Sequence, residues 1–103
     1  MITLDQVKAI VLSGDPAAKH YFQTARGNYT TWHEFKLLPE TADDLHDGGW
    51  NFQIDRFTKL EGDPVVDDIR DALDARGNVA YSYAVDFEQD TGYIHHIFSC
   101  EVI

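Results

Sequence analysis

Two runs of alternating residues near the end of the chain restrict its fold more than any other feature. One face of the first run holds Val79, Tyr81, Tyr83, Val85 and Phe87. One face of the second run holds Ile94, His96, Phe98, Cys100 and Val102. A period of two residues is that of a β-strand with one face buried. Because a polar turn from Glu88 to Gly92 separates the runs, they predict an antiparallel hairpin.

A second pair of strands is predicted earlier in the chain. Residues 29–38 are rich in aromatic and β-branched side chains, which favour strands. Residues 50–59 alternate in polarity. The face of this run that we expect to be buried holds Trp50, Phe52 and Ile54. We predict that the two strands pair as a hairpin with a long acidic connection at residues 39–49.

A short helix is predicted over residues 3–12. Thr3 and Gln6 have the spacing of a capping box, in which each side chain accepts from the other residue's backbone N–H. Gly14 is a plausible end of the helix. An apolar stripe at helical spacing holds Leu4, Val7, Ile10 and Val11.

A second helix is predicted to begin at Asp63-Pro64. Asp63 is a good N-cap, and proline is tolerated at the first helical position, where no N–H is needed. Gly77 is the expected stop. The core stripe of this helix holds Val65, Val66, Ile69, Ala72 and Leu73.

These elements predict an α+β fold in one domain, residues 1–103. The expected order is α-β-β-α-β-β, with a mostly antiparallel sheet and both helices packed on one face. Residues 15–28 are harder to assign: residues 17–22 fit either a helix or an extended segment, and Arg26-Gly27-Asn28 is typical of a turn.

The charge of the chain restricts its partners. Asp and Glu number 18 and Lys and Arg number 8, for a net charge of −10. Contacts to phosphate need clustered lysine and arginine, so we do not expect the chain to bind nucleic acid or an anionic membrane. Basic protein partners, self-assembly and nucleic-acid mimicry stay open. For mimicry, Asp67, Asp71 and Asp74 form a negative ridge, although a solvated helix face is the more common explanation.

The sequence also predicts a cytosolic protein. No apolar run approaches ~18 residues, and the N-terminus lacks the basic and apolar regions of a signal peptide. Cys100 is the one cysteine, so it forms neither an intrachain disulfide nor a cysteine-based zinc site.

No metal or other cofactor is expected. His95 and His96 point to opposite faces of a strand, so they do not chelate one ion; we expect one to pack at the sheet edge and the other to face solvent. The acidic connection resembles a calcium loop only superficially. Counted from Asp43, position 3 is Leu45 and position 12 is Ile54, where oxygen ligands are required.

Catalysis is not expected either. Cys100 lies on an apolar strand face, which favours a buried and inert thiol. The serines have no nucleophile-elbow motif, and no glycine-rich phosphate loop precedes a helix. The candidate functional residues are instead acidic residues of the two connections, which we interpret as interaction loops. They are Glu40, Asp43, Asp44, Asp47, Glu88 and Asp90.

The chain from Tyr29 to Ile103 resembles the tail-terminator, or tail-completion, proteins of long-tailed bacteriophages and prophages. The resemblance lies in the order of segments. A strand YTTWHEF leads through the acidic loop LPETADDLHDGG to the strand WNFQIDRFTKLEGDP, which contains IDRFTK. The helix VVDDIRDALDARG follows, and then the closing hairpin VAYSYAVDFEQDTGYIHHIFSCEVI with its turn DFEQDTGYIHH.

The resemblance implies a structural role without catalysis. Six copies are expected to form a ring that caps the tail tube, stops its polymerisation and presents a surface to the head-connector protein. DNA would pass through the ring without specific binding, and an acidic interior would repel it. The protein would lie in the host cytoplasm during assembly and then in the virion tail.

A second hypothesis is a small acidic inhibitor, such as an immunity or anti-defence protein. Such a protein would bind a basic protein surface through charge complementarity. It would stay monomeric or dimeric, whereas a tail terminator should form rings or co-sediment with tail tubes.

Overall fold

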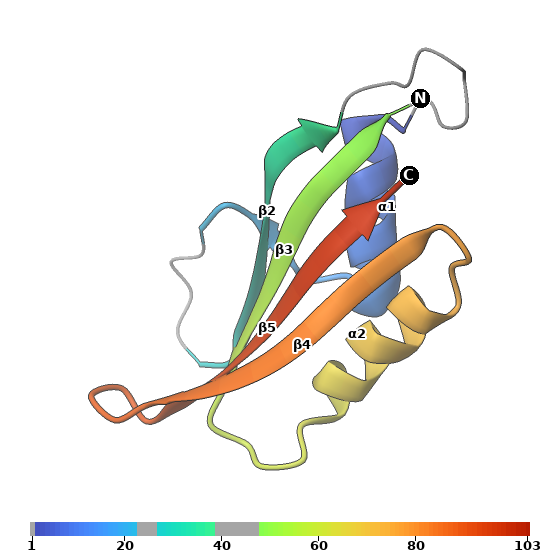
Figure 1. Ribbon diagram of the computed structural model, residues 1–103. Coiled ribbons are helices and arrows are strands. Elements are labelled where there is room, and N and C mark those ends of the chain that lie inside the picture. The colour runs from blue at the N-terminus through green and yellow to red at the C-terminus, as the bar shows by residue number, and fades with distance from the viewer. Residues whose placement is uncertain (1, 23–26, 39–47) are drawn as a thin grey trace.

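The computed structural model describes residues 2–22, 27–38 and 48–103, and it confirms the α+β class. The elements, in chain order, are α1 (Leu4–Gly14), β1 (Lys19–His20), β2 (Tyr29–Leu38), β3 (Gly49–Thr58), α2 (Pro64–Asp74), β4 (Val79–Glu88) and β5 (Tyr93–Val102). The strands form one sheet in the order β1-β2-β3-β5-β4. Every neighbouring pair is antiparallel except β1 and β2. Both helices lie on the same face of this sheet (Figure 1).

Strand β1 is the one element that the predicted order lacks. It pairs with β2 at two positions only, Lys19 with Thr31 and His20 with Trp32. The following residue, Tyr21, donates its N–H to the carbonyl of Trp32 at 2.7 Å. A two-residue strand is too short to show an alternating pattern, which is why residues 17–22 fitted two structures equally well.

The two predicted hairpins are both present. Strand β2 pairs with β3, and β4 pairs with β5. The pairing of β2 with β3 shifts by one residue between Glu34 and Lys36, so Phe35 is the extra residue of a β-bulge. Strand β3 then pairs with β5 in the middle of the sheet, so the two hairpins share one continuous face.

The helices begin where the sequence predicts. The Thr3 side chain accepts from the Gln6 N–H at 3.2 Å, and the Gln6 side chain accepts from the Thr3 N–H at 2.7 Å, which completes the capping box. At α2 the Asp63 side chain accepts from the Val65 N–H at 3.0 Å. The helix ends were less well predicted: α1 continues to Gly14, and α2 ends at Asp74, before Gly77.

The core lies between the helices and the covered face of the sheet. Phe52 and Ile54 of β3 belong to the same buried cluster as Ile69 and Leu73 of α2. Trp50 is partly buried and packs against that cluster. The predicted packing of these stripes is therefore present. The fully buried side chains on the covered face also include Trp32, Phe98 and Val102.

Gly14 lies where the two helices approach each other. A Cβ atom added to Gly14 would lie 2.9 Å from the Cα of Ile69 and 3.3 Å from the Cβ of Ala72. Glycine at this position therefore allows the close contact between α1 and α2. It is the last residue of α1, and Asp15 is the C-cap.

The hairpin of β4 and β5 extends past the helices (Figure 1). The molecule is accordingly elongated, with principal dimensions of 48 × 24 × 22 Å. Val85 and Phe87, on the face that the helices cover elsewhere, are exposed in this extension. The predicted apolar stripe of β4 is thus only partly buried, at Val79 and Tyr81 near the start of the strand.

Candidate functional site

The structure places two of the six predicted interaction residues, Glu88 and Asp90, at the end of the projecting hairpin. The other four lie outside the described residues: Glu40, Asp43, Asp44 and Asp47. Hydrogen bonds stabilise the turn itself. The Gly92 N–H donates to the Glu88 carbonyl at 2.8 Å, and the Thr91 hydroxyl donates to the Glu88 carboxylate at 3.1 Å. Asp90 is exposed, so it is the freer of the two carboxylates.

A polar cluster lies next to this turn, on the face of the sheet that the helices do not cover. Its centre is Asp55 of β3, which is only 6% exposed. Asp55 accepts from Gln53 at 2.8 Å and lies 2.7 Å from Nε2 of His95. Its second oxygen lies 4.0 Å from Nδ1 of His33. Three strands, β2, β3 and β5, therefore contribute to one cluster.

The two neighbouring histidines do point to opposite faces, as predicted. His95 contacts Asp55 on the uncovered face, and Nδ1 of His96 lies 2.6 Å from the Tyr83 hydroxyl on the other. The expectation that one histidine packs at the sheet edge was wrong. Strand β5 lies between β3 and β4, so both histidines are inside the sheet. Burial lowers the pKa of His96 and favours its neutral form.

The Asp55–His95 pair resembles two of the three members of a catalytic triad, but its surroundings differ from those of a triad. The second ring nitrogen of His95 faces the Glu88 carboxylate at 3.8 Å. Both nitrogens of the ring therefore point at carboxylates, and no hydroxyl or thiol of the described residues stands in the position of a nucleophile. In the part of the chain that the structure describes, no group of three or more His, Cys, Asp or Glu side chains is arranged to hold a metal ion.

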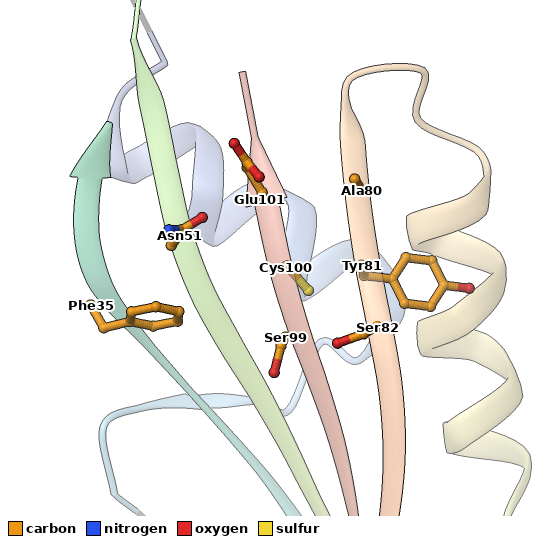
Figure 2. Close-up of a pocket in the computed structure, with 8 residues that line it drawn as sticks. All are labelled: Phe35, Asn51, Ala80, Tyr81, Ser82, Ser99, Cys100 and Glu101. Carbon is orange, nitrogen blue, oxygen red and sulfur yellow. The ribbon is translucent and has the colours of Figure 1, made fainter. Parts of the chain in front are cut away.

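A shallow groove of about 330 Å³ lies on the uncovered face (Figure 2). The residues that line it are Phe35, Asn51, Ala80, Tyr81, Ser82, Ser99, Cys100 and Glu101. Ser82 and Ser99 are opposite each other in the pairing of β4 with β5. The groove therefore offers hydroxyl, amide and carboxylate groups for hydrogen bonds.

The side chain of Cys100 points away from this groove into the core, and its thiol is poorly suited to nucleophilic chemistry. Cys100 is 3% exposed, and its Sγ lies 3.6 Å from the Phe98 carbonyl oxygen. Burial raises its pKa to about 12, so almost no thiolate forms near neutral pH. The prediction of a buried thiol is confirmed.

A second cluster lies at the β1 and β2 edge of the sheet. The sequence did not indicate it. The Glu34 carboxylate accepts from the Tyr21 hydroxyl and lies 3.1 Å from Nε2 of His20. The His20 ring stacks between those of Tyr21 and Trp32, at centroid distances of 4.0 and 3.9 Å. Although burial opposes it, hydrogen bonding lowers the pKa of Glu34, while the bond to Glu34 raises the pKa of Tyr21.

Large apolar side chains are exposed at both edges of the sheet. At the β4 edge they are Tyr83, Val85 and Phe87. At the β1 and β2 edge they are Tyr21, Phe22 and Leu37. Apolar groups gathered in this way are typical of protein interaction surfaces. The sequence signal for the first set was the alternation of β4, which predicted burial without showing that the helices cover only part of the strand.

No helix among the described residues has both the length and the apolar character needed to cross a membrane.

Comparison with known proteins leaves the family of this chain open. No protein-family model matches the sequence, and no curated protein matches it.

Proposed function

We propose that the protein is a structural component of a phage or prophage tail, where copies of the chain form a ring that caps the tail tube. The observation that carries this proposal is the projecting β4–β5 hairpin. Its apolar residues Val85 and Phe87 are exposed in the single chain, and its turn follows Glu88 and contains Asp90. Such a surface suits contacts with neighbouring copies in an assembly.

The chemistry of the described sites supports a role in assembly. In the Asp55–His95 pair, the second ring nitrogen of His95 faces another carboxylate. The thiol of Cys100 is buried, and its pKa is raised. In the proposed role these residues stabilise the sheet, and none of them takes part in a reaction. The ring would present one surface to the tail-tube protein and another to the head-connector protein.

The net charge suits a channel for DNA. Six chains of −10 carry −60 in total. A ring with this charge repels DNA phosphates, so DNA would pass through without specific binding. The protein would assemble in the host cytoplasm and remain in the virion tail.

A second candidate function is an acidic inhibitor of a basic protein, and one observation favours it. Four aspartates of α2 are exposed: Asp67, Asp68, Asp71 and Asp74. Their carboxylates lie on the solvent side of the helix, where a basic surface would meet them first. DNA mimicry is the form of inhibition that this arrangement would support.

Native mass measurement separates the two functions. The proposed tail protein should give a species near six times 11.7 kDa at raised protein concentration, and it should sediment with tubes of its cognate tail-tube protein. An inhibitor should stay monomeric or dimeric and should bind a basic partner with strong salt dependence. A protein that neither forms the six-fold species nor sediments with tubes would contradict the proposal.

A further inference from the structure

We propose that copies of this chain join head to tail, with the β4 edge of one copy added to the β1 and β2 edge of the next as one continuous antiparallel sheet. The inference deepens the proposed function, on which it rests for the closure of the ring.

The β4 edge is open to strand addition. β4 is the last strand of the sheet, so the outer backbone groups of its ten residues face no other described strand. The strand contains neither lysine nor proline, the residues that commonly protect an edge. Val85 is 53% exposed and Phe87 is 58% exposed along it. A long apolar edge of this kind is a template for another strand.

The opposite edge offers a matching surface. β1 covers β2 at Thr31 and Trp32 only, among the described residues. Phe22, just after β1, is 73% exposed, and Leu37, near the end of β2, is 49% exposed. The molecule thus has two exposed apolar edges at opposite ends of one sheet. Different surfaces that meet in this way give a heterologous contact, the kind that generates rings.

The strand directions fit this contact. β2, β3, β5 and β4 alternate in direction across the sheet, because each is antiparallel to the next. β4 therefore runs opposite to β2, and also opposite to β1, which is parallel to β2. A neighbouring copy in the same orientation would place its β1 and β2 antiparallel to β4, so the added strands would pair as the sheet already does.

The charges at the two edges also differ in sign. Lys19 and Lys36 lie on the β1 and β2 edge together with one carboxylate, that of Glu34, whereas Asp86 and Glu88 lie on β4. A twofold contact between two β4 strands would gather the acidic residues of both copies along one seam. It would also leave Phe22 and Leu37 uncovered. A head-to-tail contact covers both apolar edges and brings opposite charges to the same seam.

Two edge variants test the contact by complementation. The first carries Val85→Lys and Phe87→Lys, and the second carries Phe22→Lys and Leu37→Lys. All four positions are exposed, so both variants should fold with the thermal midpoint of the unmodified monomer. A matched control carries Leu4→Lys and Ala9→Lys on the exposed side of α1, which adds the same charge away from both edges.

Native mass measurement at high salt, with one variant isotopically labelled, gives the readout. The control should assemble like the unmodified chain, and each edge variant alone should lose all oligomers. An equal mixture of the two should form a dimer with one copy of each, because one intact β4 edge meets one intact β1 and β2 edge. The proposal is overturned if the mixture stays monomeric, or if the second variant alone dimerises, which indicates a twofold β4 contact.

The outcome also separates this contact from the proposed function. A mixed dimer, together with unmodified rings that do not bind tail tubes, would uphold the contact and contradict the tail role. Tube binding by both edge variants, with no mixed dimer, would uphold the tail role and overturn the contact. An unmodified chain that is monomeric at every salt and protein concentration would also overturn it.

Discussion

The guanidinium of Arg56 donates from Nε to Oδ2 of Asp63 at 2.9 Å, and both side chains are buried. This pair joins the C-terminal part of β3 to the residue that caps α2. The same guanidinium donates to the Thr30 hydroxyl at 3.3 Å and lies 3.8 Å from the Asp15 carboxylate, just after α1. Arg56 therefore connects both helices to two strands of the sheet.

Asp63→Ala should destabilise the protein by about 3–5 kcal/mol, because it leaves the buried charge of Arg56 without its closest partner. It also removes the cap of α2. The matched control is Asp67→Ala, an exposed aspartate in the first turn of the same helix. Urea unfolding followed by circular dichroism measures both. Equal midpoints for the two variants would contradict the role of the pair.

The same residue should contribute to acid unfolding. Burial opposes ionisation of Asp63, but hydrogen bonds from the Val65 N–H and Arg56 outweigh it, so the pKa is lowered from 3.8. A carboxylate with a lowered pKa stabilises the fold above its unfolded value, and that stability is lost as pH falls through the folded value. The slope of stability against pH below about 4 should therefore be smaller in Asp63→Asn than in the unmodified chain.

Ile69→Ala should cost about 2–5 kcal/mol in the free energy of unfolding, because Ile69 is 1% exposed in the core between α2 and the sheet. Val85→Ala, at an exposed position of β4, is the matched control and should change the monomer little. Thermal unfolding at low protein concentration checks both. A midpoint unchanged by Ile69→Ala would refute the packing of α2 on β3.

Gly14→Ala should destabilise the fold, although alanine is the better helix former by about 1 kcal/mol. The added Cβ would lie 2.9 Å from a backbone atom of α2, so the two helices would have to separate. Gly77→Ala is the control, because no atom lies within 4 Å of a Cβ added there. Chemical unfolding distinguishes the variants, and a more stable Gly14→Ala protein would contradict the close helix contact.

Cys100 should react slowly with a thiol reagent in the native protein. Its pKa of about 12 leaves little thiolate at pH 7, and the side chain is 3% exposed. In ~6 M urea the same thiol should react rapidly, because unfolding removes both effects. Absorbance of the released chromophore follows the reaction. Equal rates in the two conditions would indicate that the β4–β5 hairpin opens readily.

The elements of this fold were predictable because each has a local signal. Thr3 with Gln6 and Asp63 with Pro64 mark helix starts, and the alternation from Val79 marks a strand. The extra strand β1 was missed because its two residues carry no periodicity, and their partners Thr31 and Trp32 are remote in sequence. Propensity and pattern act within a few residues, whereas this pairing is tertiary.

The clusters were harder to predict than the strands. Asp55 and His95 are 40 residues apart and meet only because β3 pairs with β5. The alternation of each strand showed that both residues face away from the core, but not which strands are neighbours. The burial of Arg56 could not be predicted for a related reason. Arg56 lies on the covered face of β3, where the pattern predicts apolar residues. Its partners Asp15 and Asp63 lie at the ends of the two helices and meet it only in the folded chain.

Raising the salt concentration should shift the protein from monomer towards ring. Each chain carries −10, so six chains bring −60 together and repel one another. This repulsion acts over about 10 Å at ~0.1 M salt and about 3 Å at ~1 M. The proposed contacts between copies consist mainly of apolar side chains and backbone hydrogen bonds, which salt weakens far less. Light scattering behind a sizing column, at several protein concentrations, measures the shift. An acidic inhibitor bound to a basic partner should respond in the opposite sense, since its complex dissociates as salt rises. Oligomers that fall apart at high salt would therefore show that charge pairs hold the copies together, contrary to an apolar seam between β4 and its neighbour.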